Sequence, residues 1–243
     1  MKSHKFWQGM ALACLSLFLT ACPDSSSDSD GGTPHTLAGS WGGTIKDSTA
    51  APLPLQITID NSGKITNITV DGANTGLSSI ASVTAEGNNI YGFELNDGTI
   101  GGFIVDSSGQ HAGFLDDGFT FGVVQKGAPG PAGGGYVNTD IIGSWSGYGV
   151  TIDSAFNITN VFNSTGTVAS NFSFSGNGLN GTFTGNFASF YSTNGVYLGT
   201  WSDTSGSGDL QAFLSADKTF AATWACDWTY GFPDGCSFSA WNR

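Results

Sequence analysis

The chain has 243 residues and a formal net charge of −12, with 19 acidic residues against seven lysines and arginines. It lacks the clustered basic surface that nucleic acid requires, so we exclude nucleic acid as a partner. The 37 glycines and the scarcity of Glu, Lys, Arg and Met exclude a helical bundle and disfavour βαβ folds. Aromatic residues make up 13% of the chain, enough for a packed core, and we expect an all-β protein.

The first 21 residues have the pattern of a signal peptide. Lys2 and Lys5 precede an apolar run over residues 10–19, which is too short to span a bilayer. The run ends in Leu-Thr-Ala-Cys at 19–22, which resembles the lipobox of bacterial lipoproteins. The resemblance implies cleavage before Cys22, and lipid such as palmitate on the thiol and new amino group of that cysteine.

The residues after Cys22 bear on where such an anchor would hold the protein. In enterobacterial lipoproteins an aspartate directly after the acylated cysteine favours retention in the inner membrane, and Pro23 stands there instead. The resemblance therefore implies an outer-membrane lipoprotein, in the periplasmic or the surface leaflet. Residues 22–37 are rich in Ser, Asp and Gly, with no large apolar side chain before Leu37. We expect them to form a flexible acidic tether that reaches roughly 20 Å.

The remaining chain repeats itself. Gly-Ser-Trp occurs at 39–41 and again at 143–145, and the phrases at 57–60 and 65–68 recur at 150–153 and 158–161. Matched glycines and aromatic residues follow in the same order, and we attribute the drift in spacing to loop insertions. These matches predict two units at 38–126 and 140–243, joined by a Gly/Pro-rich linker at 127–139.

Within each unit, apolar and small polar residues alternate with the period of two that indicates half-buried strands. Asn-Gly and Asp-Gly steps between the runs favour tight hairpins. The first unit is expected to hold about eight strands, near 39–46, 54–60, 64–71, 79–85, 89–95, 99–106, 110–116 and 119–126, and the second a similar number. We predict two tandem antiparallel up-and-down β-barrels, with two β-sandwiches as the alternative.

The Gly-x-Trp that opens each unit resembles the first-strand signature of lipocalin-type barrels. The tether, the linker and the paired β units are also similar to bacterial surface lipoproteins of the transferrin-binding and factor-H-binding types. That likeness implies a module that binds a protein partner, although those proteins are generally richer in lysine.

Cys226 and Cys236 are the cysteines that remain after the signal peptide and Cys22, and in an oxidising compartment we expect them to form a disulfide. The bond would enclose a loop that carries Trp228, Tyr230 and Phe232, which share their parity with both cysteines and with Phe220 and Trp224. Two interpretations stay open: the loop aromatics are binding anchors, or they plug the mouth of the second barrel.

Candidate catalytic and metal-binding residues are few. His111 is the sole histidine beyond the tether, and we expect it to be an exposed residue at the end of a strand. Asp116 and Asp117 precede a glycine and are interpreted as turn residues, as are the Asp-rich loops at 60–63 and 106–109, which do not continue into a calcium-binding loop. We therefore predict no catalytic residue, no metal site and no cofactor.

Three classes of function remain. The sequence favours a non-enzymatic envelope lipoprotein that binds a macromolecule. The alternatives are a carrier of a small apolar ligand and a periplasmic protease inhibitor. Barrels of this size are expected to fill their interiors with side chains, which counts against the carrier.

Overall fold

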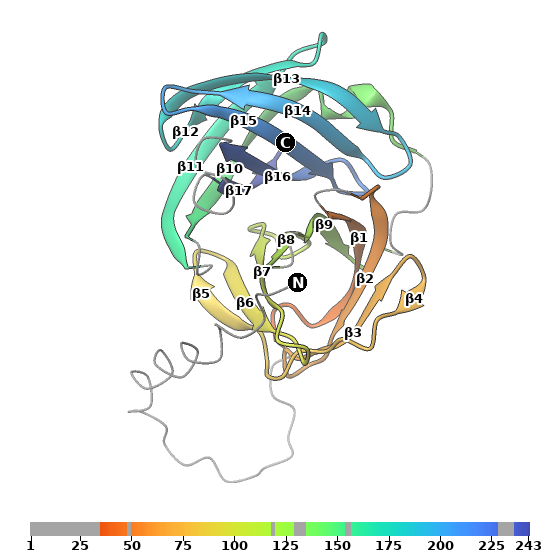
Figure 1. Cartoon of the computed structure of the whole chain (residues 1–243). Coiled ribbons are helices and arrows are strands. Elements are labelled where there is room, and N and C mark those ends of the chain that lie inside the picture. Colours follow the sequence, from red (N-terminus) through yellow and green to blue (C-terminus); the bar gives the residue numbers. More distant parts are fainter. Residues whose placement is uncertain (1–34, 48–49, 118–119, 129–134, 154–156, 228–235) are drawn as a thin grey trace, which may run out of the picture. The chain divides into compact units, whose positions relative to one another are not determined.

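A computed structural model describes residues 35–47, 50–117, 120–128, 135–153, 157–227 and 236–243 (Figure 1). The lipobox with Cys22, residues 22–34 of the tether, and the loop residues Trp228, Tyr230 and Phe232 lie outside these ranges. The described part of the chain contains no helix long and apolar enough to cross a membrane. Apart from the short 3-10 helix η2 (Asn138–Ile141), its regular elements are β-strands, which confirms the predicted all-β class.

The first unit is a nine-stranded antiparallel sheet. Its strand order is β4-β3-β2-β1-β9-β8-β7-β6-β5. The strands are β1 (Gly39–Asp47), β2 (Leu53–Ile59), β3 (Ile65–Val70), β4 (Ala73–Asn74), β5 (Thr84–Gly87), β6 (Ile90–Glu94), β7 (Ile100–Val105), β8 (His111–Asp116) and β9 (Thr120–Lys126).

This sheet does not close into the barrel that the sequence predicts, because residues 75–83 form no strand between its two ends. The segment crosses the gap through single hydrogen bonds: Ser79 N–H donates to the Ile65 carbonyl and Ile80 N–H to the Glu94 carbonyl, both at 2.9 Å. The Ser79 hydroxyl also accepts a hydrogen bond from Ile65 N–H at 2.9 Å. Such serine bonds to the backbone compete with a regular ladder. The strand expected near 79–85 is therefore reduced to β5.

The second unit is the predicted closed barrel of eight antiparallel strands, paired in sequence order with β17 returning to β10 (Figure 1). Its strands are β10 (Gly143–Ile152), β11 (Ile158–Val168), β12 (Ser173–Gly178), β13 (Gly181–Tyr191), β14 (Val196–Ser202), β15 (Ser207–Leu214), β16 (Phe220–Asp227) and β17 (Cys236–Asn242).

The alternation in the sequence sets the two faces of the barrel wall. Along β10 to β14, one register row on the outer face carries only hydroxyl side chains, and all of them are exposed: Ser144, Thr167, Ser175, Thr184 and Ser202. On each of these strands, the residues directly before and after this row point into the barrel. The abundance of Ser and Thr thus belongs to a solvated outer surface.

The opening tryptophans hold equivalent places in the two units. Each indole Nε1–H donates to the carbonyl four residues earlier, at 2.8 Å for Trp41 and 2.9 Å for Trp145. A cation from the last strand of each unit or the residue after it lies over the ring, Lys126 Nζ at 5.6 Å and the Arg243 guanidinium carbon at 4.6 Å from the centroid. The two units therefore begin and close in the same way.

The other matched phrases do not hold equivalent places. Residues 57–59 end β2, the second strand of its sheet, whereas their match at 150–152 ends β10, the first strand of the barrel. The drift in spacing is therefore not a set of loop insertions. In the first unit, the opening phrase lies in β1 and the next matched phrase in β2. In the second unit, both phrases lie in the single strand β10.

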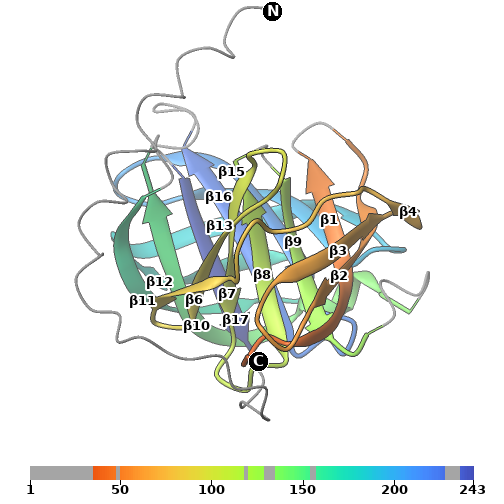
Figure 2. The same cartoon turned by 90° about the horizontal axis from the view of Figure 1, so that it is seen from below.

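The outer faces of the two units pack against each other and bury a shared apolar core (Figure 2). Phe121 on β9 stacks on Trp224 on β16, with ring centroids 4.0 Å apart. Gly113 on β8 lets β8 approach the barrel closely, because a Cβ there would lie 2.6 Å from the Phe238 ring on β17. Residues 34–243 consequently form one compact unit. Phe220 and Trp224, which lie on the same face of β16, therefore point into the interface between the units and not into the barrel interior.

Candidate functional site

The barrel encloses a cavity of about 410 Å³, within the range of pockets that hold small ligands. Side chains from all eight strands line it, so the expectation that side chains fill both interiors is wrong for the second unit. In the first unit the concave face is filled, and Phe93, Phe103 and Phe114 pack there with centroids 5.2–5.8 Å apart.

Glycines account for the free space in the barrel. They stand at inward positions of the wall: Gly147, Gly149, Gly166, Gly176, Gly185, Gly199 and Gly208. At several of these positions a Cβ would collide with the neighbouring strand, for example 1.8 Å from the Ala240 carbonyl oxygen at Gly147. The glycines therefore allow the strands to approach closely and also leave the interior without side chains.

One end of the cavity is apolar. Trp145 and Ile141 cover it, and the bond from the Trp145 indole to the Ile141 carbonyl ties η2 to the barrel. Phe174 and Phe187 pack there with ring centroids 5.0 Å apart. Leu210, only 8% exposed, completes this floor.

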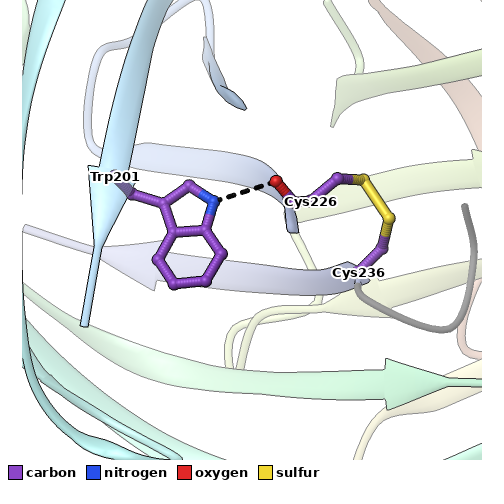
Figure 3. The surroundings of a disulfide bond; sticks show 3 residues. All are labelled: Trp201, Cys226 and Cys236. Carbon is purple, nitrogen blue, oxygen red and sulfur yellow. Dashed lines mark hydrogen bonds between the residues drawn. A yellow bond between two sulfur atoms is a disulfide. The ribbon is translucent and has the colours of Figure 1, made fainter. Parts of the chain in front are cut away.

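Two further indoles form the walls. The Trp201 Nε1–H donates to the Cys226 carbonyl at 3.3 Å (Figure 3), and the Trp241 Nε1–H donates to Thr223 Oγ1 at 2.8 Å. Phe183 meets the Trp241 ring edge to face at 6.3 Å. Because their N–H groups are already bonded within the protein, these tryptophans contribute ring surface to the cavity.

The disulfide predicted between Cys226 and Cys236 is present (Figure 3). It lies at the end of the cavity away from Trp145 and Ile141, which we call the mouth. It joins directly paired residues of β16 and β17, with Cα atoms 4.0 Å apart. The loop that it closes is the one predicted to carry binding aromatics. Although those aromatics lie outside the described residues, the ends of the loop, Asp227 and Cys236, both line the mouth.

The mouth is acidic. Asp203 and Asp227 line it, and no lysine, arginine or histidine is found among the described lining residues. Both carboxyl groups lie beside Gly206: its N–H donates to Asp203 Oδ1 at 3.1 Å, and a Cβ on it would lie 1.7 Å from Asp227 Oδ2. Asp227 is 5% exposed, so its carboxyl group sits within the protein.

His111 is not the exposed strand-end residue that the sequence predicts. It begins β8, is 8% exposed, and lies between the two units, where its ring stacks on Phe220. Its Nδ1 is 3.0 Å from Asp106 Oδ2 and its Nε2 is 2.8 Å from Asp217 Oδ2 in the barrel. The expectation fails because the outward side of β8 faces a second unit instead of water.

Of the remaining acidic candidates, Asp60, Asp106 and Asp116 bond within their own turns, and Asp117 bonds to β7. Asp116 accepts a hydrogen bond from Thr120 N–H across the turn, and Asp117 accepts one from Ile100 N–H. Asp60 accepts hydrogen bonds from the Ser62 hydroxyl and from backbone N–H groups, which lower its pKa. Burial of Asp106 raises its pKa, but bonds from Ser108, His111 and Gln110 outweigh that effect and lower it. These carboxylates have the turn roles that the sequence assigns to them.

No protein-family model and no curated protein matches the sequence. Solved structures with a similar arrangement include a protein of unknown function from the DUF3598 family of Nostoc punctiforme, with 11% identity, 86% of this chain and 96% of that chain covered, and a TM-score of 0.33. Another is a mutant of the vaccine antigen transferrin binding protein B from Haemophilus parasuis, with 10% identity and a TM-score of 0.41. That match covers 84% of this chain but 45% of the other, so this chain spans less than half its length. At these scores the likeness carries no conclusion about family or function.

Proposed function

We propose that this protein is a non-enzymatic, lipid-anchored binding protein of the bacterial envelope and that its eight-stranded barrel is the binding element. The cavity in the barrel carries this proposal, because natural barrels of this size either fill with side chains or hold one small ligand. A volume of about 410 Å³ lined by aromatic and hydroxyl side chains suits a ligand with an apolar body. The alternative that the sequence ranked second, a small-ligand carrier, thus becomes the preferred mode of binding.

The described chemistry supports binding over catalysis. The buried histidine is engaged between two carboxylates at the interface of the units and does not line the cavity. A general base must reach the reacting group directly or through one water. The cavity offers ring surfaces, hydroxyl groups and two carboxylates, which suit recognition of a ligand.

The neutral fluorescent probe N-phenyl-1-naphthylamine tests the cavity. We expect it to bind the purified barrel protein saturably, at one molecule per chain, with increased fluorescence. Gly178→Val should weaken binding at least tenfold. The atoms nearest to a Cβ there belong to Phe183 and Ser164 and lie at 3.6–3.7 Å, so the side chain fits and its added methyl groups occupy the cavity.

Thr182→Val is the matched control, because it places the same side chain on the outer face of the neighbouring strand. It should leave the affinity unchanged, and circular dichroism and melting curves should show that both variants are folded. If Gly178→Val and Thr182→Val bind the probe alike, the probe sits elsewhere and the proposal fails.

The anchor is tested in cells. Full-length protein should incorporate labelled palmitate and fractionate with the outer membrane, and Cys22→Ala should abolish both because it removes the acceptor thiol. Protease treatment of intact cells then separates the leaflets: release of the folded units places them on the surface, where a protein partner would also have access. Palmitate on the Cys22→Ala protein would refute the assigned lipid site.

A further inference from the structure

Two buried serines point into the cavity with hydroxyl groups that bond to no other residue in the described part of the chain. Ser164 on β11 is 3% exposed, Ser239 on β17 is 4% exposed, and both line the cavity. Buried hydroxyl groups in proteins are hydrogen-bonded in the large majority of cases, because burial without a partner costs free energy. The two serines therefore mark a place where a bound molecule can supply the partner.

Glycines of β10 bring the two serines to one part of the wall. Ser164 is paired with Gly147, and Ser239 with Gly149, the next inward position along β10. A Cβ on Gly149 would lie 2.2 Å from the Ser239 Oγ, so this hydroxyl group lies over β10 and inside the barrel. Ser164 and Ser239 thus flank β10 where β10 itself has no inward side chain.

The placement of these serines is unusual for a strand that is covered on its outer side. On β17, Phe238 and Ala240 point outward into the core that the two units share, whereas Ser237 and Ser239 point into the barrel. A strand that served only packing would be apolar on both faces in this position. Solvation of an outer surface does not account for Ser239, and its inward hydroxyl group is available to a molecule in the cavity.

The wall across the barrel is aromatic. In the closed order of eight strands β14 lies opposite β10; it carries Trp201, and the neighbouring β13 carries Phe187. The Trp201 indole N–H donates to the Cys226 carbonyl, so this residue presents its ring to the cavity. A molecule between the two walls meets aromatic rings on one side and hydroxyl groups on the other.

The charged residues of the lining favour a neutral molecule. Asp203 accepts hydrogen bonds from the Ser205 hydroxyl at 2.6 Å and from Asn180 Nδ2 at 3.4 Å, and Asp227 is not without a partner either. Within the ranges that the structure describes, no lysine, arginine or histidine lines the cavity. A charged ligand would therefore lose its hydration without gaining a free counter-charge.

Resting on the proposed function, we propose that the cavity selects neutral apolar compounds that carry one hydroxyl or carbonyl group, such as phenols and cyclic alcohols or ketones. Ser164 and Ser239 bond the oxygen, and the aromatic wall packs on the body. A serine hydroxyl both donates and accepts, so it serves either group. A hydrocarbon of the same shape leaves both serines unbonded, and a site built to bond a hydroxyl group discriminates against such an analogue.

A pair of compounds that differ only by a hydroxyl and a methyl group tests this inference: para-butylphenol and para-butyltoluene. Both are titrated at neutral pH by displacement of N-phenyl-1-naphthylamine from the purified protein. A purely apolar cavity would favour para-butyltoluene, because the phenol would lose its hydrogen bonds to water. We expect para-butylphenol to bind at least as tightly, because the serines replace those bonds.

The combined substitution of Ser164→Ala and Ser239→Ala should weaken binding of para-butylphenol at least tenfold. It should leave the affinity for para-butyltoluene within about threefold, which also shows that the cavity is intact. Ser144→Ala combined with Ser202→Ala is the matched control, because it removes two hydroxyl groups that are exposed on the outer face of the same barrel. This control should change neither affinity.

The outcomes separate this inference from the proposed function. If the unmodified protein binds para-butyltoluene more tightly than para-butylphenol, or if the inward substitutions do not weaken the phenol selectively, recognition by the serines is wrong while the cavity remains a binding site. If neither compound binds and N-phenyl-1-naphthylamine does not bind either, the proposed function itself is wrong.

Discussion

Trp224→Ala is expected to lower the free energy of unfolding by about 3–5 kcal/mol, the largest stability effect that we predict for one substitution. Trp224 is 5% exposed and stacks on Phe121 at 4.0 Å, in the core shared by the two units. Removing the indole leaves a cavity in an interface that cannot collapse, because both walls are hydrogen-bonded sheets.

Equilibrium denaturation in urea measures this change, and a fall in melting temperature of roughly 10 °C should accompany it. Both units should unfold in one transition, since residues 34–243 form one compact unit. Tyr191→Ala, at a side chain 37% exposed, should cost less than about 1 kcal/mol. Equal effects of the two substitutions would show that the interface does not stabilise the protein.

His111→Ala is expected to cost about 2–3 kcal/mol, because it leaves Asp106 and Asp217 facing each other across the interface without their shared partner. Breaking a fully buried pair costs about 3–5 kcal/mol, and the 37% exposure of the Asp217 side chain reduces that figure. A double-mutant cycle with Asp217→Asn isolates the contact between the units. Additive losses would mean that His111 and Asp217 do not interact.

The same contact predicts an acid limit. Burial raises the pKa of Asp217, but hydrogen bonds from Ser215, Thr219 and His111 outweigh it and lower the pKa to about 2. Because the folded pKa lies below the unfolded value, the stabilisation is complete above about pH 4 and is lost as the pH falls towards 2. Screening at the exposed side of Asp217 limits this contribution to about 1 kcal/mol. Melting curves between pH 2 and 6 should be flatter for Asp217→Asn than for the unmodified protein.

The alternation of apolar and polar residues does not predict the cavity, because it contains no information on whether the inward side chains fill the barrel. Period two identifies which residues point inward, but whether they meet across a barrel depends on their size. The inward residues of the second unit include Gly147, Gly166 and Gly185, whereas the first unit has Phe93 and Phe103 on its concave face. Glycine at every second position of a strand is the signal that could have indicated the hollow barrel.

The prediction of two separate tandem barrels leaves the outer face of each unit in water, and so it does not include the shared core. Strands β7 to β9 contain runs of consecutive buried residues, such as Phe103-Ile104-Val105, where a sheet with one solvated face would alternate. A continuous apolar run indicates burial on both faces. Applied to these strands, that rule predicts a second layer over β8, and with it the burial of His111.

The all-β class, the closed barrel of the second unit and the pairing of Cys226 with Cys236 could be predicted from the amino-acid sequence, because strand period, turn residues and the number of cysteines can be read along the chain. Three features emerge from the folded chain alone: the first sheet stays open at residues 75–83, the second barrel is hollow, and His111 joins the two units. These features depend on contacts between residues far apart in sequence, such as His111 with Asp217, and no local pattern records which distant surfaces meet.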